Sequence, residues 1–298
     1  MLRRRMDAVP RTARKIIAAV AALLAVVGLV VIAHTTGKAR SGVPGSLTVA
    51  TWNMCGVRQW HCTDFGAPSA KKAQLERLAT RSGVRAFFLQ ETCAGDLEAV
   101  RADLVGSWHT LFRPYTSRDA TGHTSTIRCA GFGQGAAGIA LLSAYPLSGT
   151  ASVPAQQPTV GLRRGILCAT VAAYRVRLCT THLSRPGDDR AHPHWEFRDD
   201  QLRALVAAAP SPRTVYGGDL NLDPPGPRNP ASWVWPDAPY RADRECDQKT
   251  ASSRAGRPTH VSGHKIDYLF TGLPRTGCSV HETGASDHYA LLMRVRTG

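Results

Sequence analysis

The sequence predicts an α/β fold in which two packed, largely antiparallel β-sheets form a sandwich covered by outer helices. Short apolar runs of strand type outnumber the segments with helical periodicity, and several of these runs are close enough to form hairpins. Once the N-terminal segment is set aside, about 255 residues remain, which is enough for one large core. We therefore expect a single domain over residues 47–298.

The expected elements follow one another from the first strand onward. Two helices with an apolar stripe are predicted over about 70–82 and 195–208. Residues 117–136 are rich in Gly, Ser and Thr and are typical of an exposed loop, while 224–239 is a proline-rich excursion. The predicted strands, bounded by turn residues, span 47–51, 86–89, 138–142, 165–172, 175–181, 214–216, 266–270 and 289–295.

The N-terminal segment 1–33 has the order of a signal peptide or of a signal anchor with its N-terminus inside. It carries six Lys or Arg against the single Asp7, ahead of an apolar run from Ile16 to Ala33. This run approaches the roughly 20 residues that cross a bilayer, and its last three residues offer a small-residue cleavage pattern. Both outcomes stay open, and both predict an extracellular protein, secreted or anchored to the cell membrane, with residues 34–46 as a tether.

The eight cysteines agree with an oxidising compartment, because no Cys-x-x-Cys cluster of the kind that binds zinc is present in the sequence. Cys168 and Cys179 lie opposite one another in the hairpin predicted around a two-residue connection, which places them within disulfide reach. Cys55 is expected to pair with Cys62 because the two are close in sequence. The remaining four cysteines cannot be assigned.

The net charge is strongly positive, at +15 for the whole chain. Residues 1–40 hold eight of the 37 Lys and Arg and one of the 22 Asp and Glu, so the remainder carries +8. A basic exported domain suits a polyanion such as nucleic acid or a phospholipid surface. Arg greatly outnumbers Lys, however, which also fits genomic base composition, so charge alone leaves a solvated basic face as an equal alternative.

Polar groups come directly after several of the predicted strands. A rigid sheet that presents oxygen and imidazole groups at one edge can bind a hard cation and supply a proton acceptor, so the pattern indicates catalysis. The segments are Thr51-Trp52-Asn53, Gln90-Glu91, Thr181-His182-Leu183, Gly218-Asp219-Leu220-Asn221, Lys265-Ile266-Asp267-Tyr268 and Ser286-Asp287-His288.

Together with Gly138-Ile139-Ala140-Leu141-Leu142-Ser143, these segments resemble the ordered motif series of the endonuclease/exonuclease/phosphatase superfamily, which has the DNase I-like fold. The resemblance covers nearly all of residues 47–298. Each motif alone is weak, but seven in the correct order are specific. The resemblance implies a four-layer sandwich of two packed β-sheets flanked by helices, and residues 47–298 as its catalytic domain.

The resemblance also implies a Mg²⁺ site, with Mn²⁺ or Ca²⁺ as alternatives. Glu91 follows a buried strand, where a carboxylate is costly unless it meets a cation, and it resembles the principal metal ligand of the family. Asn53 matches the neutral oxygen donor that helps Glu91 to hold the ion. Asp287 resembles a ligand on the second side of the ion, directly or through water.

The remaining motif residues resemble the catalytic groups of the family. His182 matches the histidine that stabilises the phosphoryl transition state, a role open to a ring that protonates near neutral pH. Asp219 and Asn221 alternate with a leucine and so project to the same side, where they would activate the nucleophile and steady the phosphoryl group. Asp267 is implied to orient His288 as the general base.

The sequence thus predicts a metal-dependent phosphodiesterase that uses activated water, with nucleic acid as the first substrate class. A sphingomyelinase-like phospholipase C is the alternative, in which Trp233 and Trp235 either insert into a membrane or pack in a loop; a phosphomonoesterase is third. A catalytically silent anion-binding protein is the non-enzyme alternative, although such a protein has no need of the full motif set. No protein partner is expected.

Two further sets of residues lie outside the motifs. Three histidines are expected at the surface: His192, His194 and His264. The arginines that suit a phosphate backbone lie on predicted loops, at Arg163, Arg164, Arg185, Arg190, Arg254 and Arg257.

Overall fold

The computed structural model describes residues 45–62, 64–210 and 212–298. The predicted signal segment and nearly all of the tether lie outside the described residues. Within the described part of the chain, no helix is long and apolar enough to cross a membrane.

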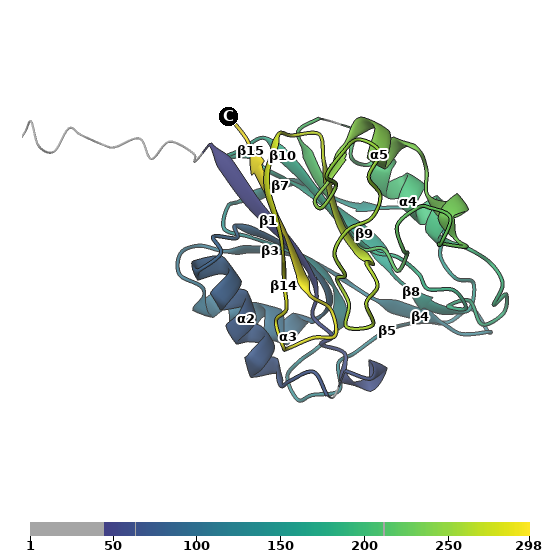
Figure 1. The fold of residues 1–298 in the computed structure, drawn as a ribbon. Helices are drawn as coiled ribbons and strands as arrows, with labels where there is room; N and C mark the ends of the chain where they lie inside the picture. Colours follow the sequence, from purple (N-terminus) through teal and green to yellow (C-terminus); the bar gives the residue numbers. More distant parts are fainter. Residues whose placement is uncertain (1–44, 63, 211) are drawn as a thin grey trace, which may run out of the picture. The chain divides into compact units, whose positions relative to one another are not determined.

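The first sheet has six strands in the order β14-β15-β1-β2-β6-β3 (Figure 1). Every neighbouring pair is antiparallel except β1 and β2, which are parallel, so their C-terminal ends meet at one edge of the sheet. That edge carries Asn53 and Glu91. The strands are β1 (Ser46–Asn53), β2 (Ala86–Cys93), β3 (His109–Pro114), β6 (Ala137–Ser143), β14 (Arg275–His281) and β15 (Ala290–Arg296).

The second sheet repeats this plan with six strands in the order β12-β13-β11-β10-β9-β7. Its one parallel pair is β10 and β11, whose register places His182 opposite Asp219, while Asp219 on its other side faces Asp267 of β13. The strands are β7 (Leu147–Val153), β9 (Gly165–Val171), β10 (Val176–His182), β11 (Thr214–Asp219), β12 (Arg244–Glu245) and β13 (Asp267–Thr271).

Helices cover the outer face of each sheet, as Figure 1 shows. Because side chains alternate along a strand, Phe87 and Leu89 of β2 pack toward the helices, whereas Phe88 packs into the core between the sheets. The result is the predicted four-layer sandwich. The helices on the first sheet are α2 (Pro68–Thr80) and α3 (Ala94–Asp103), and those on the second are α4 (Arg198–Ala207) and α5 (Ala238–Ala242).

A small third sheet lies at the ends of the main strands, in the order β5-β4-β8. It comprises β4 (Thr116–Arg118), β5 (Thr124–Thr126) and β8 (Gly161–Arg163), and two short 3₁₀ turns, η1 (Arg58–Trp60) and η2 (Ser232–Val234), complete the described elements. The segment 117–136, predicted as a loop, therefore contains most of a short hairpin. Its side chains are nevertheless largely exposed.

The predicted strands all form, but the sequence missed the strands at the edges of both large sheets. These are β3 and β14 in the first sheet and β7 and β12 in the second. β7 and β14 are only partly buried, so they lack the apolar pattern that marks the central strands. The sequence also missed α3, which buries only Leu97 and Val100. Helix α4 begins at Arg198, three residues later than expected.

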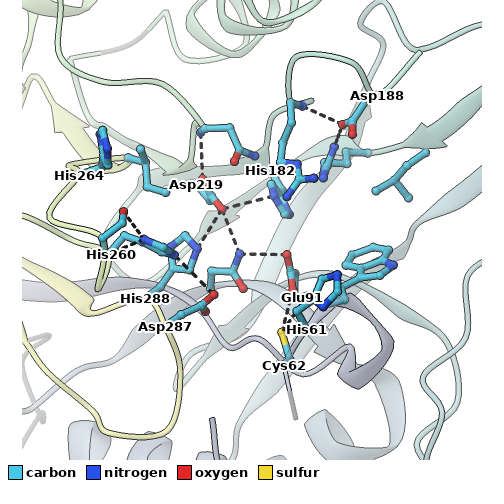
Figure 2. Close-up of a pocket in the computed structure, with 18 of the residues that line it drawn as sticks. His61, Cys62, Glu91, His182, Asp188, Asp219, His260, His264, Asp287 and His288 are labelled. Carbon is cyan, nitrogen blue, oxygen red and sulfur yellow. Dashed lines mark hydrogen bonds and ion pairs between the residues drawn. The ribbon is translucent and has the colours of Figure 1, made fainter. Parts of the chain in front are cut away.

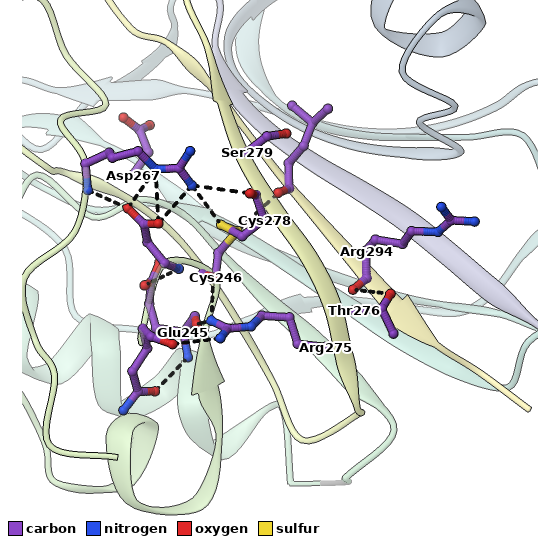
Figure 3. Close-up of a disulfide and its surroundings, with 12 residues drawn as sticks. Glu245, Cys246, Asp267, Arg275, Thr276, Cys278, Ser279 and Arg294 are labelled. Carbon is purple, nitrogen blue, oxygen red and sulfur yellow. Dashed lines mark hydrogen bonds and ion pairs between the residues drawn. A yellow bond between two sulfur atoms is a disulfide. The ribbon is translucent and has the colours of Figure 1, made fainter. Parts of the chain in front are cut away.

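Four disulfides link all eight cysteines, and the two predicted pairings are confirmed. Cys168 and Cys179 lie opposite one another in the register of β9 and β10, and Cys55 pairs with Cys62. The other two bonds, Cys93–Cys129 and Cys246–Cys278, were not predicted. Figure 3 shows the second of these, which ties the chain after β12 of one sheet to β14 of the other.

The two tryptophans considered for membrane insertion differ in exposure. Trp233 is 63% exposed, but Trp235 is only 8% exposed and donates its indole N–H to the Asp223 carbonyl at 2.8 Å. Trp235 also packs against Tyr268 and Phe270 of β13. The packed-loop alternative is therefore correct for Trp235, and the pair cannot insert together.

Candidate active site

The ends of the two parallel strand pairs open into one cleft of about 590 Å³ (Figure 2). Seven of the eight predicted site residues line it, and the eighth, Asp267, lies fully buried behind His288. The seven are Asn53, Glu91, His182, Asp219, Asn221, Asp287 and His288. Side chains from both sheets thus converge, as the strand-end pattern predicted.

The carboxylate of Asp219 lies at the centre of this cleft and is 1% exposed. Its Oδ2 is 3.0 Å from Asn53 Nδ2, 3.3 Å from His182 Nε2 and 3.7 Å from His288 Nε2. Its Oδ1 accepts a hydrogen bond from the backbone N–H of Asn221 at 2.9 Å. Both oxygens therefore face groups that hold a negative charge in place.

Two glycines allow β11 to bring Asp219 to this position. A Cβ on Gly217 would lie 1.9 Å from the Tyr268 carbonyl oxygen, and one on Gly218 would lie 2.0 Å from that of Thr181. Both glycines also have positive φ, at 153° and 135°. Only glycine permits so close an approach to both neighbouring strands.

His182 is connected to Glu91 through Tyr115, a residue that the sequence did not single out. The backbone N–H of Glu91 donates to Tyr115 Oη at 3.1 Å, and the Tyr115 hydroxyl lies 2.8 Å from His182 Nδ1. The hydroxyl is free to donate to Nδ1, which leaves the ring proton on Nε2, facing the cleft. Burial lowers the pKa of His182 well below its usual value, and Arg164 adds to this shift. The structure thus favours a neutral donor over the protonated ring expected from sequence.

His288 and Asp267 form the predicted dyad, with Nδ1 and Oδ2 at 2.9 Å. Burial alone would lower the pKa of His288, but the carboxylates of Asp267 and Asp219 outweigh it and raise the pKa to about 10. The segment 286–288 is fixed to β1 by the hydroxyl of Ser286. This hydroxyl donates to the Asn53 carbonyl at 2.7 Å and accepts from the His288 N–H at 3.0 Å. The dyad is therefore held rigidly beside the first sheet.

Glu91 has the features expected of a metal-binding carboxylate. Burial raises its pKa to about 7, although His288 and the Asn53 amide act in the opposite direction. No Lys, Arg or His of the described residues forms an ion pair with it; its hydrogen-bond donor is Asn53 Nδ2, at 3.3 Å. Its φ of 49° is unusual for a non-glycine residue and typical of functional sites.

The donor set fits Mg²⁺, which binds one or two carboxylates and keeps several waters. Glu91 would be the principal ligand and Asp287, which lies across the cleft, would approach the ion directly or through water (Figure 2). The Asn53 amide nitrogen donates to Glu91 and Asp219, and its oxygen accepts from the Cys55 N–H at 3.0 Å. This oxygen keeps a second lone pair, so the expected role of Asn53 as a ligand beside Glu91 stays a prediction. Cys62 Sγ is near Glu91, but it is bonded to Cys55 and cannot ligate.

The predicted phosphate-binding arginines separate into distinct groups. Arg164 and Arg185 line the cleft, and Arg164 forms a buried ion pair with Asp188. Arg163 instead lines another depression beside β3. The last three lie outside the cleft: Arg190 is exposed, Arg254 stacks on Tyr240 and Arg257 pairs with Asp247.

Among the histidines, His192 and His194 lie outside the cleft, and His192 stacks on Trp195. His264 is exposed as expected but also lines the cleft, where it contacts Asp223 at 2.9 Å. His61 and His260 line the cleft too, and neither was predicted. For His260 the only signal in the sequence is its place shortly before Asp267.

The fold and the site together define a class: a two-sheet sandwich with acidic and imidazole groups gathered at the ends of its central strands. Residues 50–288 match the model of the Endonuclease/Exonuclease/phosphatase family, and the chain belongs to this family. Its members are hydrolases of phosphoester bonds, and they are typically metal-dependent. A comparison with curated proteins found no match.

Several solved structures share the fold. An endonuclease/exonuclease/phosphatase from Beutenbergia cavernae is 22% identical, with a TM-score of 0.56, over 85% of this chain and 72% of that one. The human Nocturnin catalytic domain with bound sulfate is 15% identical, with a TM-score of 0.61, over 84% and 94%. TDP2 from D. rerio complexed with single-strand DNA product is 15% identical, with a TM-score of 0.55, over 84% and 98%.

Proposed function

We propose that this protein is an extracellular, Mg²⁺-dependent nuclease that hydrolyses phosphodiester bonds with activated water. The observation that carries the proposal is the position of Asp219, whose Oδ2 lies within 3.7 Å of polar nitrogens from both sheets. Glu91 lies on one side of this group and the His288–Asp267 dyad on the other. The cleft thus brings together three groups. His288 is the proton acceptor, His182 is the hydrogen-bond donor to a phosphoryl oxygen, and Glu91 is the cation ligand.

The protein groups divide the reaction between them. In the metal-free protein His288 is protonated at neutral pH, because Asp267 and Asp219 raise its pKa to about 10. A cation bound nearby would lower this pKa, and the neutral ring, with its Nδ1–H donated to Asp267, would then take a proton from water at Nε2. Asp219 Oδ2 accepts the other hydrogen of that water and orients it, and the Nε2–H of His182 donates to a phosphoryl oxygen. Mg²⁺, when bound, stabilises the charge that develops on the phosphoryl and leaving oxygens.

Three observations support nucleic acid as the substrate. Arg185 is exposed and adds positive charge to the cleft, whereas the charge of Arg164 is balanced by its ion pair with Asp188. The catalytic domain has a net charge of +8. A structure of the same fold, TDP2 from D. rerio, is complexed with single-strand DNA product. Phospholipid is less well supported, because Trp235 is buried and leaves Trp233 as the one exposed aromatic of that pair.

The extracellular location rests on the N-terminal segment and on the cross-links. Four disulfides are typical of exported proteins, since cytosolic thiols are kept reduced. Fractionation of cells that express the full chain would test this location. Recovery in the cytosol with reduced cysteines would contradict it.

The activity is tested with the purified protein and four substrates: DNA, RNA, sphingomyelin vesicles and a phosphomonoester. Each is incubated with Mg²⁺ or with EDTA, and His288→Ala, which lacks the proposed proton acceptor, serves as the matched low-activity control. We expect cleavage of nucleic acid in Mg²⁺ alone. Hydrolysis of sphingomyelin or of the monoester, with DNA and RNA left intact, would replace the nuclease by the corresponding alternative.

A further inference from the structure

A second group of metal-binding side chains lies next to the catalytic dyad. His260, Asp287 and His288 each offer one ligand atom, and these atoms all lie within 4.8 Å of one another. His260 Nε2 is 3.5 Å from Asp287 Oδ2, and the two imidazole rings meet edge to face with their centroids 4.7 Å apart. The catalytic arrangement described above makes no use of His260.

The backbone fixes this group in place. The segment around His260 pairs with the segment around His288 as an antiparallel bridge. Val261 N–H donates to the Asp287 carbonyl at 2.8 Å, and Tyr289 N–H donates to the Thr259 carbonyl at 2.7 Å. The three side chains therefore face one another on paired backbone and not on separate loops.

Both imidazoles have a polar partner on the nitrogen that faces away from the group. His288 Nδ1 is 2.9 Å from Asp267 Oδ2. His260 Nδ1 is 2.6 Å from the hydroxyl of Ser262 and also accepts the backbone N–H of Ser262 at 3.1 Å. A cation on the two Nε2 atoms requires the tautomer with the proton on Nδ1, donated by His288 to Asp267 and by His260 to the Ser262 hydroxyl. A histidine held through one nitrogen by a carboxylate or hydroxyl is the usual arrangement at protein metal sites.

The donor types select the cation. Two imidazole nitrogens and one carboxylate oxygen are the protein ligands of open zinc sites, in which a further position is left for water. Mg²⁺ prefers oxygen ligands and binds imidazole poorly. The group therefore differs in preference from Glu91, even though Asp287 is common to both.

We propose that His260, Asp287 and His288 form a second cation site that takes Zn²⁺ or another divalent ion with affinity for imidazole, and that an ion bound there inhibits hydrolysis. The inhibitory part rests on the proposed function, because an ion on His288 Nε2 removes the proton acceptor of the reaction. The binding part does not depend on it.

Binding is tested on the full-length protein with its disulfides intact, stripped of metal and kept in excess Mg²⁺. Co²⁺ serves as the spectroscopic probe, and Zn²⁺ is then titrated to displace it. We expect visible bands of low-coordinate Co²⁺ in the wild type. His260→Phe keeps a ring against His288 but loses the ligand, so it should raise the half-saturating Zn²⁺ concentration by about tenfold or more.

His264→Phe is the matched control. His264 lines the same cleft but contacts Asp223 instead of the cation group, so Zn²⁺ binding should match the wild type. Equal half-saturating Zn²⁺ concentrations in the wild type and His260→Phe would contradict the proposed site. A half-saturating Zn²⁺ concentration that rises in Glu91→Gln but not in His260→Phe would also overturn it, because the ion would then lie at Glu91.

Inhibition is measured on nucleic acid at saturating Mg²⁺, with each variant compared with its own rate without Zn²⁺. In His260→Phe, the Zn²⁺ concentration for half-maximal inhibition should rise in parallel with the half-saturating Zn²⁺ concentration. In His264→Phe, both concentrations should equal those of the wild type. Zn²⁺ that binds without slowing hydrolysis would refute the inhibitory part. If no phosphodiester is cleaved at all, the proposed function fails, but the Co²⁺ spectrum still decides the cation site.

Discussion

The two sheets bring their polar side chains to the cleft in the same way but secure them differently. Each has a central parallel pair whose C-terminal ends meet at the site. In the first sheet, disulfides follow those ends directly: Cys55–Cys62 after β1 and Cys93–Cys129 after Glu91 of β2. In the second sheet, the disulfide Cys168–Cys179 lies within the strands, and hydrogen bonds alone hold Asp219.

This difference matches the two roles that the sheets would have in the proposed reaction. Glu91 is a desolvated carboxylate with an unusual φ, which folding alone would tend to relax, so covalent links beside it are useful. Asp219 is surrounded by donors that already favour its position. We infer that the first sheet carries the metal side of the reaction and the second sheet, with His288, the proton side.

The largest effect is expected when His288, the proposed proton acceptor, is replaced. His288→Ala removes the group that accepts a proton from water, so turnover should fall by roughly 10²- to 10⁴-fold with the fold retained. His264→Ala, at the rim of the same cleft, is the control and should stay close to the wild type. Single-turnover rates and thermal unfolding measure the two quantities, and near-wild-type turnover of His288→Ala would remove it from the mechanism.

A change at Glu91, the proposed metal ligand, should instead weaken the affinity for Mg²⁺. Glu91→Gln keeps the shape of the side chain but loses the charge that attracts a hard cation, so the Mg²⁺ concentration for half-maximal activity should rise by about tenfold or more. Stabilisation of the protein by Mg²⁺ against heat should weaken in parallel. An unchanged Mg²⁺ titration would place the ion elsewhere in the cleft.

The pH dependence of Mg²⁺ binding also tests whether Glu91 is the ligand. Burial raises the pKa of Glu91 to about 7 in the metal-free protein, so the carboxylate is mostly protonated at pH 6 and mostly ionised at pH 8. Since Mg²⁺ binds the ionised form, its dissociation constant should fall by about tenfold over this range. Calorimetry in two buffers would detect the released proton. A constant that does not vary with pH, or that varies equally in Glu91→Gln, would exclude this origin.

Removing one disulfide from each sheet tests the comparison directly. Cys55→Ala/Cys62→Ala and Cys168→Ala/Cys179→Ala open short loops of similar length, and loop closure predicts a similar loss of about 2–3 kcal/mol for each. Only the first variant should raise the Mg²⁺ midpoint, by several-fold, because only Cys62 contacts Glu91. Equal Mg²⁺ midpoints in the two variants would show that the links do not support the metal side.

Much of the site could be predicted because its residues end strands whose apolar runs are visible in the sequence. Asn53, Glu91 and Asp219 each follow such a run, and the parallel pairs bring the strand ends together. The same reasoning predicted Cys168–Cys179 from a hairpin. Where local pattern and sheet position agree, the sequence alone is sufficient.

The features that were missed depend on contacts between distant, weakly patterned segments. His260 reaches His288 only because two irregular segments pair, and Tyr115 joins His182 to Glu91 from a short link between β3 and β4. The bond Cys246–Cys278 joins the residue after β12 to the middle of β14, and both are edge strands that lack apolar alternation. Such partners are set by tertiary packing, which leaves no periodic trace.

The smallest effect concerns the rim of the cleft. If the substrate is a polyanion, turnover on DNA at limiting substrate should fall several-fold between low and physiological salt, because phosphate contacts release counterions. Arg185 is exposed and lines the cleft, so Arg185→Ala should flatten the salt dependence by about one phosphate contact, a change of roughly 0.7–0.9 in the logarithmic slope. Arg163→Ala, which changes a depression away from the cleft, is the matched control and should keep the wild-type slope. Identical slopes in all three proteins would mean that Arg185 does not contact the phosphate backbone.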